Sequence, residues 1–555
     1  MNRRDFFKTS AFGAAALGIS FSPFATACTR NHFDTIIKNG TIYSGDGKPA
    51  IKGDLGIREG KIAAIGQDLG SSADLVIDAK GMAVSPGFID IHSHTDTNLF
   101  EAPKGDSRIF QGVTTDIGGN CGDSPFPYSD AYYEANKERL RWGNPFWKDI
   151  DGFYTALDNN KIGINYASYV GQGSLRSSVV GNKNIPATKE QIEQMCNILD
   201  KELEMGAIGL SFGLEYAPGS YASVEEMIAL CKVVAKHDAL YAIHMRNEDN
   251  FVEQAVAEAI DFARKSGARL EISHLKAQNE PNWHKLPHLL ELIDEARNGG
   301  IDITFDRYPY LAFFTGLSNI IPLNMRDGST DDILARLDNP VTEKTIGQYA
   351  ENRVKQLGGA QKILIAACSR PENAQYSGKN IAECCEISGL DIWPMIHHLL
   401  VTERLGVQMA VFAMKEENLN MIYAHPLSMP ASDGSVYSPE GVLSKEIPHP
   451  RSYGTFPRFF EKFVREEKVV DMATAIYKCT GLPASRLHIG NRGLLIPGYA
   501  ADVVVFNPDT IKDLATYANP HTFPTGIEHV FVNGAHAISE GKHTGTLAGH
   551  TLCRV

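Results

Sequence analysis

Histidine side chains and one aspartate stand at the ends of apolar runs in this sequence. His92 and His94 lie in GFIDIHSHTD, where an apolar run stops at His-x-His. Because residues i and i+2 of a strand point to the same side, both imidazoles can face one metal ion. His244 and His274 close two later apolar runs, and Asp433 closes a third. Imidazoles that bind an ion and a carboxylate that moves protons are the parts of a metal-dependent hydrolase.

Cys121 is a further candidate ligand. It stands in VTTDIGGNCGDSP, on a glycine-rich loop after the second predicted strand. Zinc is bound well by thiolate together with imidazole. A buried structural cysteine is the simpler interpretation, and it suits the cysteines in apolar or helical contexts: Cys196, Cys231, Cys368, Cys384, Cys385, Cys479 and Cys553. Nine cysteines in 555 residues do not indicate a disulfide framework.

Asp433, in MPASDGS, is the candidate general acid/base. A zinc-bound water has its pKa lowered to about 7, so a nearby carboxylate can accept its proton and return it to a leaving amine. The simpler alternatives are a carboxylate that caps a loop and, for His244 and His274, hydrogen-bonded core histidines.

Alternating strand-like and helix-like segments in the middle of the chain predict an α/β fold. Helices are expected at 189–204, 224–236, 252–265 and 286–297. Eight strands are expected to end near His92, Ile117, Val170, Phe212, His244, His274, Asp306 and Asp433. Eight such units indicate a (β/α)₈ TIM-like barrel, whose chemistry lies at the carboxyl ends of the strands.

Both ends of the chain have a different sequence pattern from the middle. Short alternating segments broken by Asn-Gly, Asp-Gly and Glu-Gly fill residues 36–84, and similar segments return at 494–508 and 529–538. We therefore expect a small β-sandwich built from residues 33–82 and 486–555, and a barrel over 83–485. More than a hundred residues separate the last two strands, which predicts an inserted subdomain at about 311–420.

The composition and charge of the chain indicate which kinds of binding partner to expect. Apolar residues make up 43% and charged residues 21%, as in an ordinary globular enzyme. The net charge is −13, and the sequence contains no basic stripe. Nucleic acid is therefore not an expected partner.

The N-terminal residues resemble an export signal. NRRDFFK (residues 2–8) is similar to a twin-arginine signal, and a short apolar run follows at 11–19. Ala25-Thr26-Ala27 precedes Cys28. Residues 1–27 are expected to be a signal peptide, with either cleavage after Ala27 or lipid attached to Cys28; a leader on a cytoplasmic enzyme is the simpler alternative. The favoured location is the periplasm, as a soluble enzyme or a membrane-anchored lipoprotein.

Taken in order, seven motifs resemble the N-acyl-D-amino-acid deacylases of the amidohydrolase superfamily: GFIDIHSHTD, VTTDIGGNCGDSP, AIHMRNE, ISHLK, FDRYPY, ASDGS and HPRSYGTFPR. The resemblance covers nearly the whole chain after the signal. It implies one tight zinc site formed by Cys121, His244 and His274. It also implies a weaker second site, where His92 and His94 lie beside Cys121, with Asp433 as the general acid/base.

The resemblance also implies the residues that bind the substrate carboxylate: Lys276, Tyr308 and Arg451, with Tyr216 close by. A guanidinium pairs bidentately with a carboxylate, and Lys and Tyr donors can fix its orientation. The alternatives are a surface ion pair for Arg451 and local charge neutralisation for Lys276. Asp96, Arg246 and Glu248 are expected outside the ligands, with Asp96 orienting an imidazole.

The expected function is zinc-dependent hydrolysis of N-acyl-D-amino acids, small molecules that yield a carboxylic acid and a free amino acid. The D configuration comes from the resemblance alone. A cyclic amidase or isopeptidase of the dihydroorotase or hydantoinase type is the alternative, and related enzymes of that type bridge two metals with a carboxylated lysine. INYASYV and AIGLSFG contain no lysine, which weighs against it. A lipoprotein that only binds ligands is a third interpretation.

Overall fold

The computed structural model describes residues 32–136 and 147–555. The expected signal peptide and Cys28 lie outside the described residues. Across the described part, no helix combines the length and the apolar character needed to cross a membrane.

Strands from both ends of the chain form one nine-stranded sheet. The N-terminal strands β1–β5 meet the C-terminal strands β18–β21 where β5 pairs antiparallel with β18. These strands share an apolar cluster that includes Ile37, Leu55, Val503 and Phe531. The strands are β1 Phe33–Ile42, β2 Ile51–Arg58, β3 Lys61–Gly66, β4 Ala73–Asp78, β5 Ala83–Pro86, β18 Val503–Phe506, β19 Ile527–Val532, β20 Ala535–Ser539 and β21 Lys542–His543.

The centre of the molecule is an α/β unit with two parallel sheets, of order β6-β7-β8 and β17-β13-β12-β11-β10-β9. The strands are β6 Phe88–Asp90, β7 Val113–Gly118, β8 Asn165–Ser168, β9 Val170–Gly171, β10 Gly209–Gly213, β11 Leu240–His244, β12 Arg269–Ile272, β13 Ile303–Arg307 and β17 Ser428–Pro430. The sheets meet on one side at Tyr169, which alone separates β8 from β9. On the other side Ser93 forms a parallel bridge with Gly434. The expected α/β class is confirmed.

The helices between these strands follow the predicted ranges closely. They include α6 Lys189–Met205, α7 Val224–Lys236, α8 Val252–Ser266 and α9 Leu286–Asn298. Local signals set the ends. Thr188 and Gln191 form a capping box that begins α6, and Gly206 ends it with φ of 119°. Other helices around the strands are α1 Asn98–Glu101, α2 Asp106–Ile109, α3 Asp130–Asn136, α4 Ile150–Asn160, α5 Gln172–Val179, α14 Glu416–Ala424, α15 Arg451–Arg458, α16 Met472–Cys479 and α17 Gly481–Leu487.

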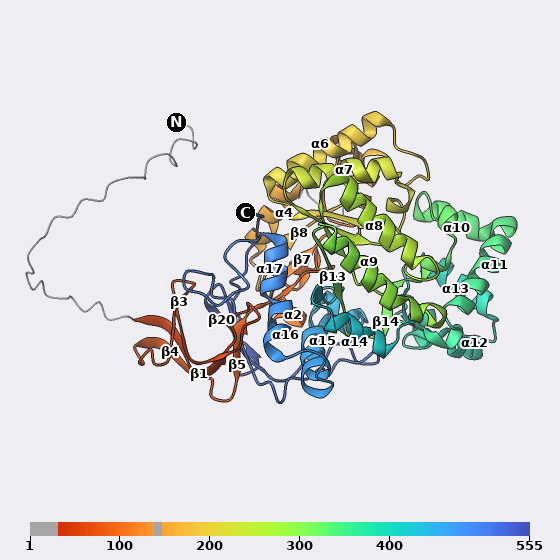
Figure 1. Cartoon of the computed structure of the whole chain (residues 1–555). Helices are drawn as coiled ribbons and strands as arrows, with labels where there is room; N and C mark the ends of the chain where they lie inside the picture. The colour runs from red at the N-terminus through yellow and green to blue at the C-terminus, as the bar shows by residue number, and fades with distance from the viewer. Residues whose placement is uncertain (1–31, 137–146) are drawn as a thin grey trace, which may run out of the picture.

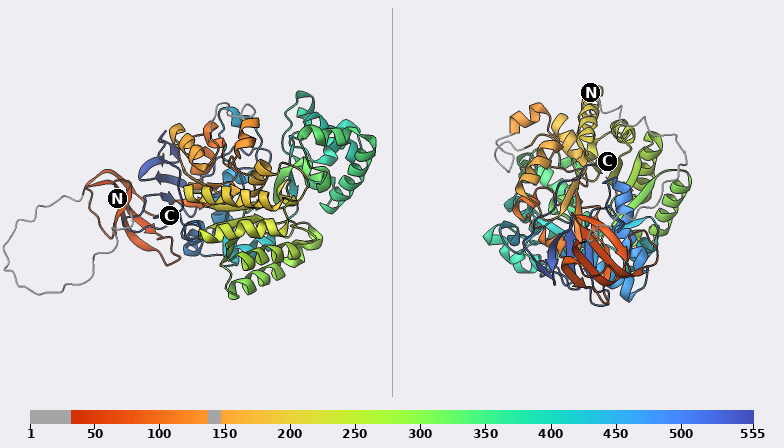
Figure 2. Two further views of the ribbon diagram at one scale, coloured as in Figure 1. Left: turned by 90° about the horizontal axis from the view of Figure 1, so that it is seen from above. Right: turned by 90° about the vertical axis from the view of Figure 1, so that its left-hand side faces the viewer.

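Between β13 and β17 lies a separate group of elements with its own antiparallel sheet, of order β14-β16-β15. Its apolar cluster includes Trp393, Ile396 and Val411. This inserted subdomain and the terminal sheet lie at opposite ends of the molecule (Figures 1 and 2). Its elements are β14 Ala312–Gly316, α10 Thr330–Asp338, α11 Pro340–Gln356, β15 Ile363–Ile365, α12 Ile381–Ser388, α13 Ile392–Thr402 and β16 Gln408–Phe412.

Candidate metal centre

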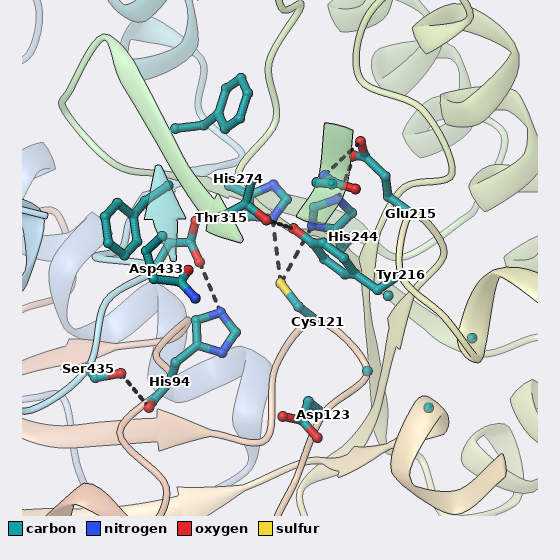
Figure 3. Close-up of a pocket in the computed structure, with 18 of the residues that line it drawn as sticks. His94, Cys121, Asp123, Glu215, Tyr216, His244, His274, Thr315, Asp433 and Ser435 are labelled. Carbon is teal, nitrogen blue, oxygen red and sulfur yellow. Dashed lines mark hydrogen bonds and ion pairs between the residues drawn. The ribbon is translucent and has the colours of Figure 1, made fainter. Parts of the chain in front are cut away.

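The predicted ligands all lie at or just after the carboxyl ends of parallel strands. His92 and His94 follow β6, Cys121 follows β7, His244 ends β11 and His274 follows β12. Because parallel strands share one direction, residues at their carboxyl ends meet on one rim. Figure 3 shows the Cys121 side chain pointing toward His244 and His274.

The Cys121 sulfur lies among three imidazole nitrogens. Its Sγ atom is 3.4 Å from Nε2 of His92, 3.7 Å from Nδ1 of His244 and 3.6 Å from Nε2 of His274. Around a tetrahedral zinc ion with ordinary Zn–S and Zn–N bonds, sulfur and nitrogen donors lie about 3.6 Å apart. The spacing of the donors therefore fits a zinc ion.

The loop that carries Cys121 is held close to the strands. Cys121 has φ of 51°, in the left-handed region. A Cβ atom on the next residue, Gly122, would meet the backbone nitrogen of Gly213 at 2.6 Å, so this position requires glycine. Asp96 accepts hydrogen bonds from the Gly119 backbone N–H at 2.8 Å and from the Tyr166 hydroxyl at 2.7 Å. Burial raises the pKa of the Asp96 carboxyl to about 6, and the charge of the neighbouring His94 opposes this rise. Asp96 thus anchors the loop, and its expected role as the partner of an imidazole stays a prediction.

Each imidazole that faces the sulfur has a carboxylate on its other nitrogen. The pairs are His92–Asp306 at 3.1 Å, His244–Glu215 at 3.1 Å and His274–Glu248 at 2.9 Å. Carboxylates in this position fix the tautomer and orientation of metal-binding histidines. Sequence reasoning placed Glu248 outside the ligands but missed Asp306 and Glu215. Both follow the same rule as the ligands, since Asp306 is in β13 and Glu215 comes two residues after β10 ends.

A protonated imidazole next to the Cys121 sulfur favours the thiolate. Burial alone would raise the pKa of the Cys121 thiol, but the charge of His92 and hydrogen bonds from His244 and His274 hold it well below its ordinary value. The thiolate is the form of cysteine that binds metal.

Asp433 lies beside this cluster. Its Oδ1 atom is 3.3 Å from Nε2 of His92 and 3.1 Å from Nε2 of His94, and its Oδ2 atom accepts a hydrogen bond from Arg451 at 2.8 Å. Burial would raise the pKa of the Asp433 carboxyl, but the charges of Arg451 and His92 hold it well below the ordinary value. Asp433 is therefore an ionised carboxylate next to the predicted metal ligands.

Two overlapping groups of side chains in the described part could hold an ion. The first comprises His92, Cys121, His274 and Asp433, and the second His244, Glu248 and His274. The second group surrounds the ammonium of Lys276, which lies 2.6 Å from Glu248 and 2.7 Å from Nδ1 of His274. A cation there would lie against another cation, so the positions beside the Cys121 sulfur suit an ion better. His94 belongs to neither group and contacts Asp433 instead.

The four residues expected to bind substrate line the same cavity, of about 750 Å³. Arg451 and Lys276 are held in ion pairs with Asp433 and Glu248. The Tyr308 hydroxyl is buried and has no hydrogen-bond partner among the described residues. The Tyr216 hydroxyl lies 3.4 Å from Oγ1 of Thr315 in the inserted subdomain.

Arg246 turns away from the cluster. Its Nε atom donates to Glu258 and its Nη1 atom to the Ser220 carbonyl. A guanidinium engaged there has no contact with a ligand, so the interpretation of Arg246 as a residue around the metal ligands is not supported by its contacts.

The sequence profile of the amidohydrolase family matches residues 75–309 and 389–537. The chain belongs to this family. The unmatched stretch between the two parts coincides with most of the inserted subdomain.

Several relatives that align with nearly the whole chain are deacylases. The chain is 33% identical to D-aminoacylase from Alcaligenes xylosoxydans xylosoxydans over 94% of this chain and 98% of the relative. It is 34% identical to N-acyl-D-glutamate deacylase from the same organism, over 90% and 93%. A crystal structure of N-acyl-D-glutamate deacylase from Bordetella bronchiseptica, complexed with zinc and a phosphonate mimic of the tetrahedral intermediate, superposes with a TM-score of 0.79 at 32% identity. It covers 94% of this chain and 100% of that one. The expected resemblance is confirmed.

Proposed function

We propose that this protein hydrolyses the amide bond of N-acyl-D-amino acids with the help of zinc, releasing a carboxylic acid and a free amino acid. The observation that carries the proposal is the Cys121 sulfur among three imidazole nitrogens, with the Asp433 carboxylate beside them. Relatives that share nearly the whole chain include a D-aminoacylase, an N-acyl-D-glutamate deacylase and an N-acyl-D-aspartate deacylase, which supports both the linear amide and the D configuration.

Cys121, His244 and His274 would hold the tight zinc, and His92 and His94 would line a second, weaker position beside Cys121. Bound zinc polarises a carbonyl oxygen and lowers the pKa of water to about 7. Glu215, Glu248 and Asp306 keep the ligand rings in orientation.

In this proposal Asp433 transfers a proton from the attacking water to the leaving amine. As an ionised carboxylate it accepts the proton of the attacking water and then gives it to the departing nitrogen. Arg451 keeps the Asp433 carboxylate ionised and, with Tyr308, faces the substrate carboxylate. Lys276 and Tyr216 complete the wall of the cavity around this position.

The strands that carry these residues are inferred to form a (β/α)₈ barrel. Support comes from the two meeting edges of the parallel sheets, Tyr169 between β8 and β9 and the bridge from Ser93 to Gly434. Backbone hydrogen bonds continue that bridge, from Asp433 to His92 at 2.8 Å and from His94 to Gly434 at 2.7 Å.

We further propose that residues 1–27 direct export and that Cys28 receives lipid, so that the exported enzyme is a membrane-anchored lipoprotein. The support is the sequence NRRDFFK, the apolar run and Ala-Thr-Ala before Cys28. Separation of periplasmic, membrane and cytoplasmic fractions checks this localisation.

Activity and metal content of the purified protein test the proposed function. We expect bound zinc, release of amino acid from N-acetyl-D-methionine, and much slower release from the L enantiomer. Asp433→Asn should keep its zinc and lose about 10²- to 10⁴-fold in kcat, because the proton acceptor is removed while the ligands remain.

Two results would contradict the proposal. Full turnover in the Asp433→Asn variant would remove Asp433 from its role. Hydrolysis of dihydrouracil or a hydantoin ring in preference to the linear amide would favour the cyclic amidase alternative.

A further inference from the structure

The cavity offers few cations to a substrate. Lys276 and Arg451 are the only lysine and arginine among the described residues that line it. The Lys276 ammonium is paired with Glu248, and the Arg451 guanidinium with Asp433. An N-acyl amino acid already brings one carboxylate, on its α-carbon, that needs a cation here. A second carboxylate, on the side chain, has no further lysine or arginine to meet in this part of the chain.

Carboxylates also line the outer cavity. Asp123 follows the Cys121 loop and accepts a hydrogen bond from the Ser174 hydroxyl at 3.0 Å. Glu215 follows β10, and Glu446 approaches from the segment before α15. Figure 3 shows Asp123 and Glu215 on two sides of Cys121. These side chains come from separate elements and surround the cavity with negative charge.

Nearby groups only partly offset this charge. Glu215 accepts hydrogen bonds from His244 at 3.1 Å and from the Asn319 amide at 3.5 Å, and the charges of the partly buried Arg326 and Arg353 also act on it. Arg326 does not line the cavity. Burial and the neighbouring Arg451 hold the pKa of His449 well below its ordinary value, so this lining imidazole is neutral at pH 7.

Part of the polar lining, away from the candidate metal ligands, is uncharged. Hydroxyl and amide groups face the cavity from α5, from the inserted subdomain and from the loop between α5 and α6. They are Ser174, Ser177, Asn182, Thr315, Asn319 and Gln408. Groups of this kind can donate to and accept from a neutral polar side chain.

We propose that the amino acid accepted by this site has an uncharged side chain, and that acidic side chains are rejected. This inference rests on the proposed function and names its substrate class. A side-chain carboxylate entering the cavity would lose water without meeting a further lysine or arginine in the described lining, and it would approach Asp123 and Glu446. The corresponding amide has the same shape without that cost. The side-chain preference thus differs from the one that the N-acyl-D-glutamate deacylase carries in its name.

Isosteric substrate pairs give a direct test with the zinc-loaded enzyme. N-acetyl-D-glutamine is compared with N-acetyl-D-glutamate, and N-acetyl-D-asparagine with N-acetyl-D-aspartate. Each pair differs by one charge at nearly constant shape. We expect kcat/KM to be about 100-fold or more higher for the amide in each pair. Equal values, or faster turnover of either acid, would overturn the inference and leave the proposed hydrolysis intact. Turnover of neither member would overturn the proposed function and this inference with it.

Charge-removing variants test the cause of the discrimination. In Asp123→Asn and in Glu446→Gln the ratio of amide to acid turnover should fall several-fold, because a repelling charge is gone and the shape is kept. Asp74→Asn, an exposed change in the terminal sheet, is the matched control and should leave the ratio unchanged. A ratio that stays the same in both cavity variants would show that these carboxylates do not set the preference.

Discussion

At the scale of single residues, three histidine rings of the candidate metal centre are held in place at both of their nitrogens. One nitrogen of His92, His244 and His274 faces the Cys121 sulfur, and the other meets a carboxylate. A ring fixed in this way loses little freedom when an ion binds, and its tautomer is already chosen. The carboxylates therefore matter to the metal although they are not themselves the proposed ligands.

Asp306→Asn tests this arrangement. The Asp306 carboxylate contacts Nδ1 of His92 at 3.1 Å and accepts the backbone N–H of His274 at 2.8 Å. Replacing it by an amide should lower zinc affinity about 10- to 100-fold, measured by competition with a chelator. Asp54→Asn is the control, because Asp54 is also buried but receives backbone N–H groups in the terminal sheet. Equal zinc affinity in the two variants would contradict a role for Asp306 at the centre.

Residue types at strand ends predicted the ligands well. The structure brings Cys121, His92, His244, His274 and Asp433 together as expected. The supporting carboxylates were harder to find because an aspartate or glutamate is common on any surface, and only the fold reveals which one faces a ring. Ion pairing of Lys276 and Arg451 was among the sequence alternatives, but the partners Glu248 and Asp433 could not be named, because a pair between residues far apart in sequence leaves no local signal.

At the scale of elements, a short series of hydrogen bonds connects the inserted subdomain to the candidate metal centre. Asn319, in the turn after β14, donates from its side chain to Glu215, and Glu215 holds His244. Arg326, also in the inserted subdomain, donates to the Asn319 carbonyl oxygen. The insertion is therefore both a wall of the cavity and a support for one ligand ring.

Asn319→Ala should weaken zinc binding about 3- to 10-fold, less than loss of a carboxylate that touches the ring directly. Asn339→Ala provides the comparison within the same subdomain. Asn339 caps α11, so its replacement should lower the melting temperature by removing about 1 kcal/mol of cap energy while zinc affinity stays the same. If Asn319→Ala changes only the melting temperature, the path to Glu215 has no effect on the metal.

Helix ranges could be predicted almost to the residue because capping signals such as Thr188 with Gln191, and the terminal Gly206, are local. The interior of the insertion gave no such prediction. Its three strands pair with partners up to a hundred residues away, as β14 does with β16, and short apolar runs do not specify those partners.

At the scale of the whole molecule, chemistry and stability occupy opposite ends of the parallel strands. Asp302 directly precedes β13, at the amino end, away from the rim. Its carboxylate accepts hydrogen bonds from Arg486 of α17 at 2.6 Å, from Arg269 of β12 at 3.0 Å and from Arg297 of α9. Burial would raise the pKa of Asp302, but the charge of Arg486 and these hydrogen bonds hold it well below the ordinary value.

A carboxyl whose pKa is lowered by folding stabilises the protein above its unfolded pKa, and the contribution is lost as pH falls through the folded value. Asp302→Asn should therefore reduce the free energy of unfolding by about 1 kcal/mol at pH 7, after allowance for its partial exposure. The difference from wild type should shrink below about pH 4. Chemical denaturation across pH measures it, and kcat at pH 7 should not change. If the loss of unfolding free energy in Asp302→Asn grew as the pH fell, the stabilising role of the ionised Asp302 would be contradicted.

The pairing of β5 with β18 joins residues 83–86 to residues 503–506. During synthesis the first five strands leave the ribosome long before their partners exist, and until then the β5 edge is bare backbone that could pair with another chain. The terminal sheet can be completed only after β21 (Lys542–His543) has been made. A nascent chain arrested before β18 would thus expose an unpaired β5 edge that can pair with another chain. Translation through β18 covers this edge and so lowers the tendency to aggregate.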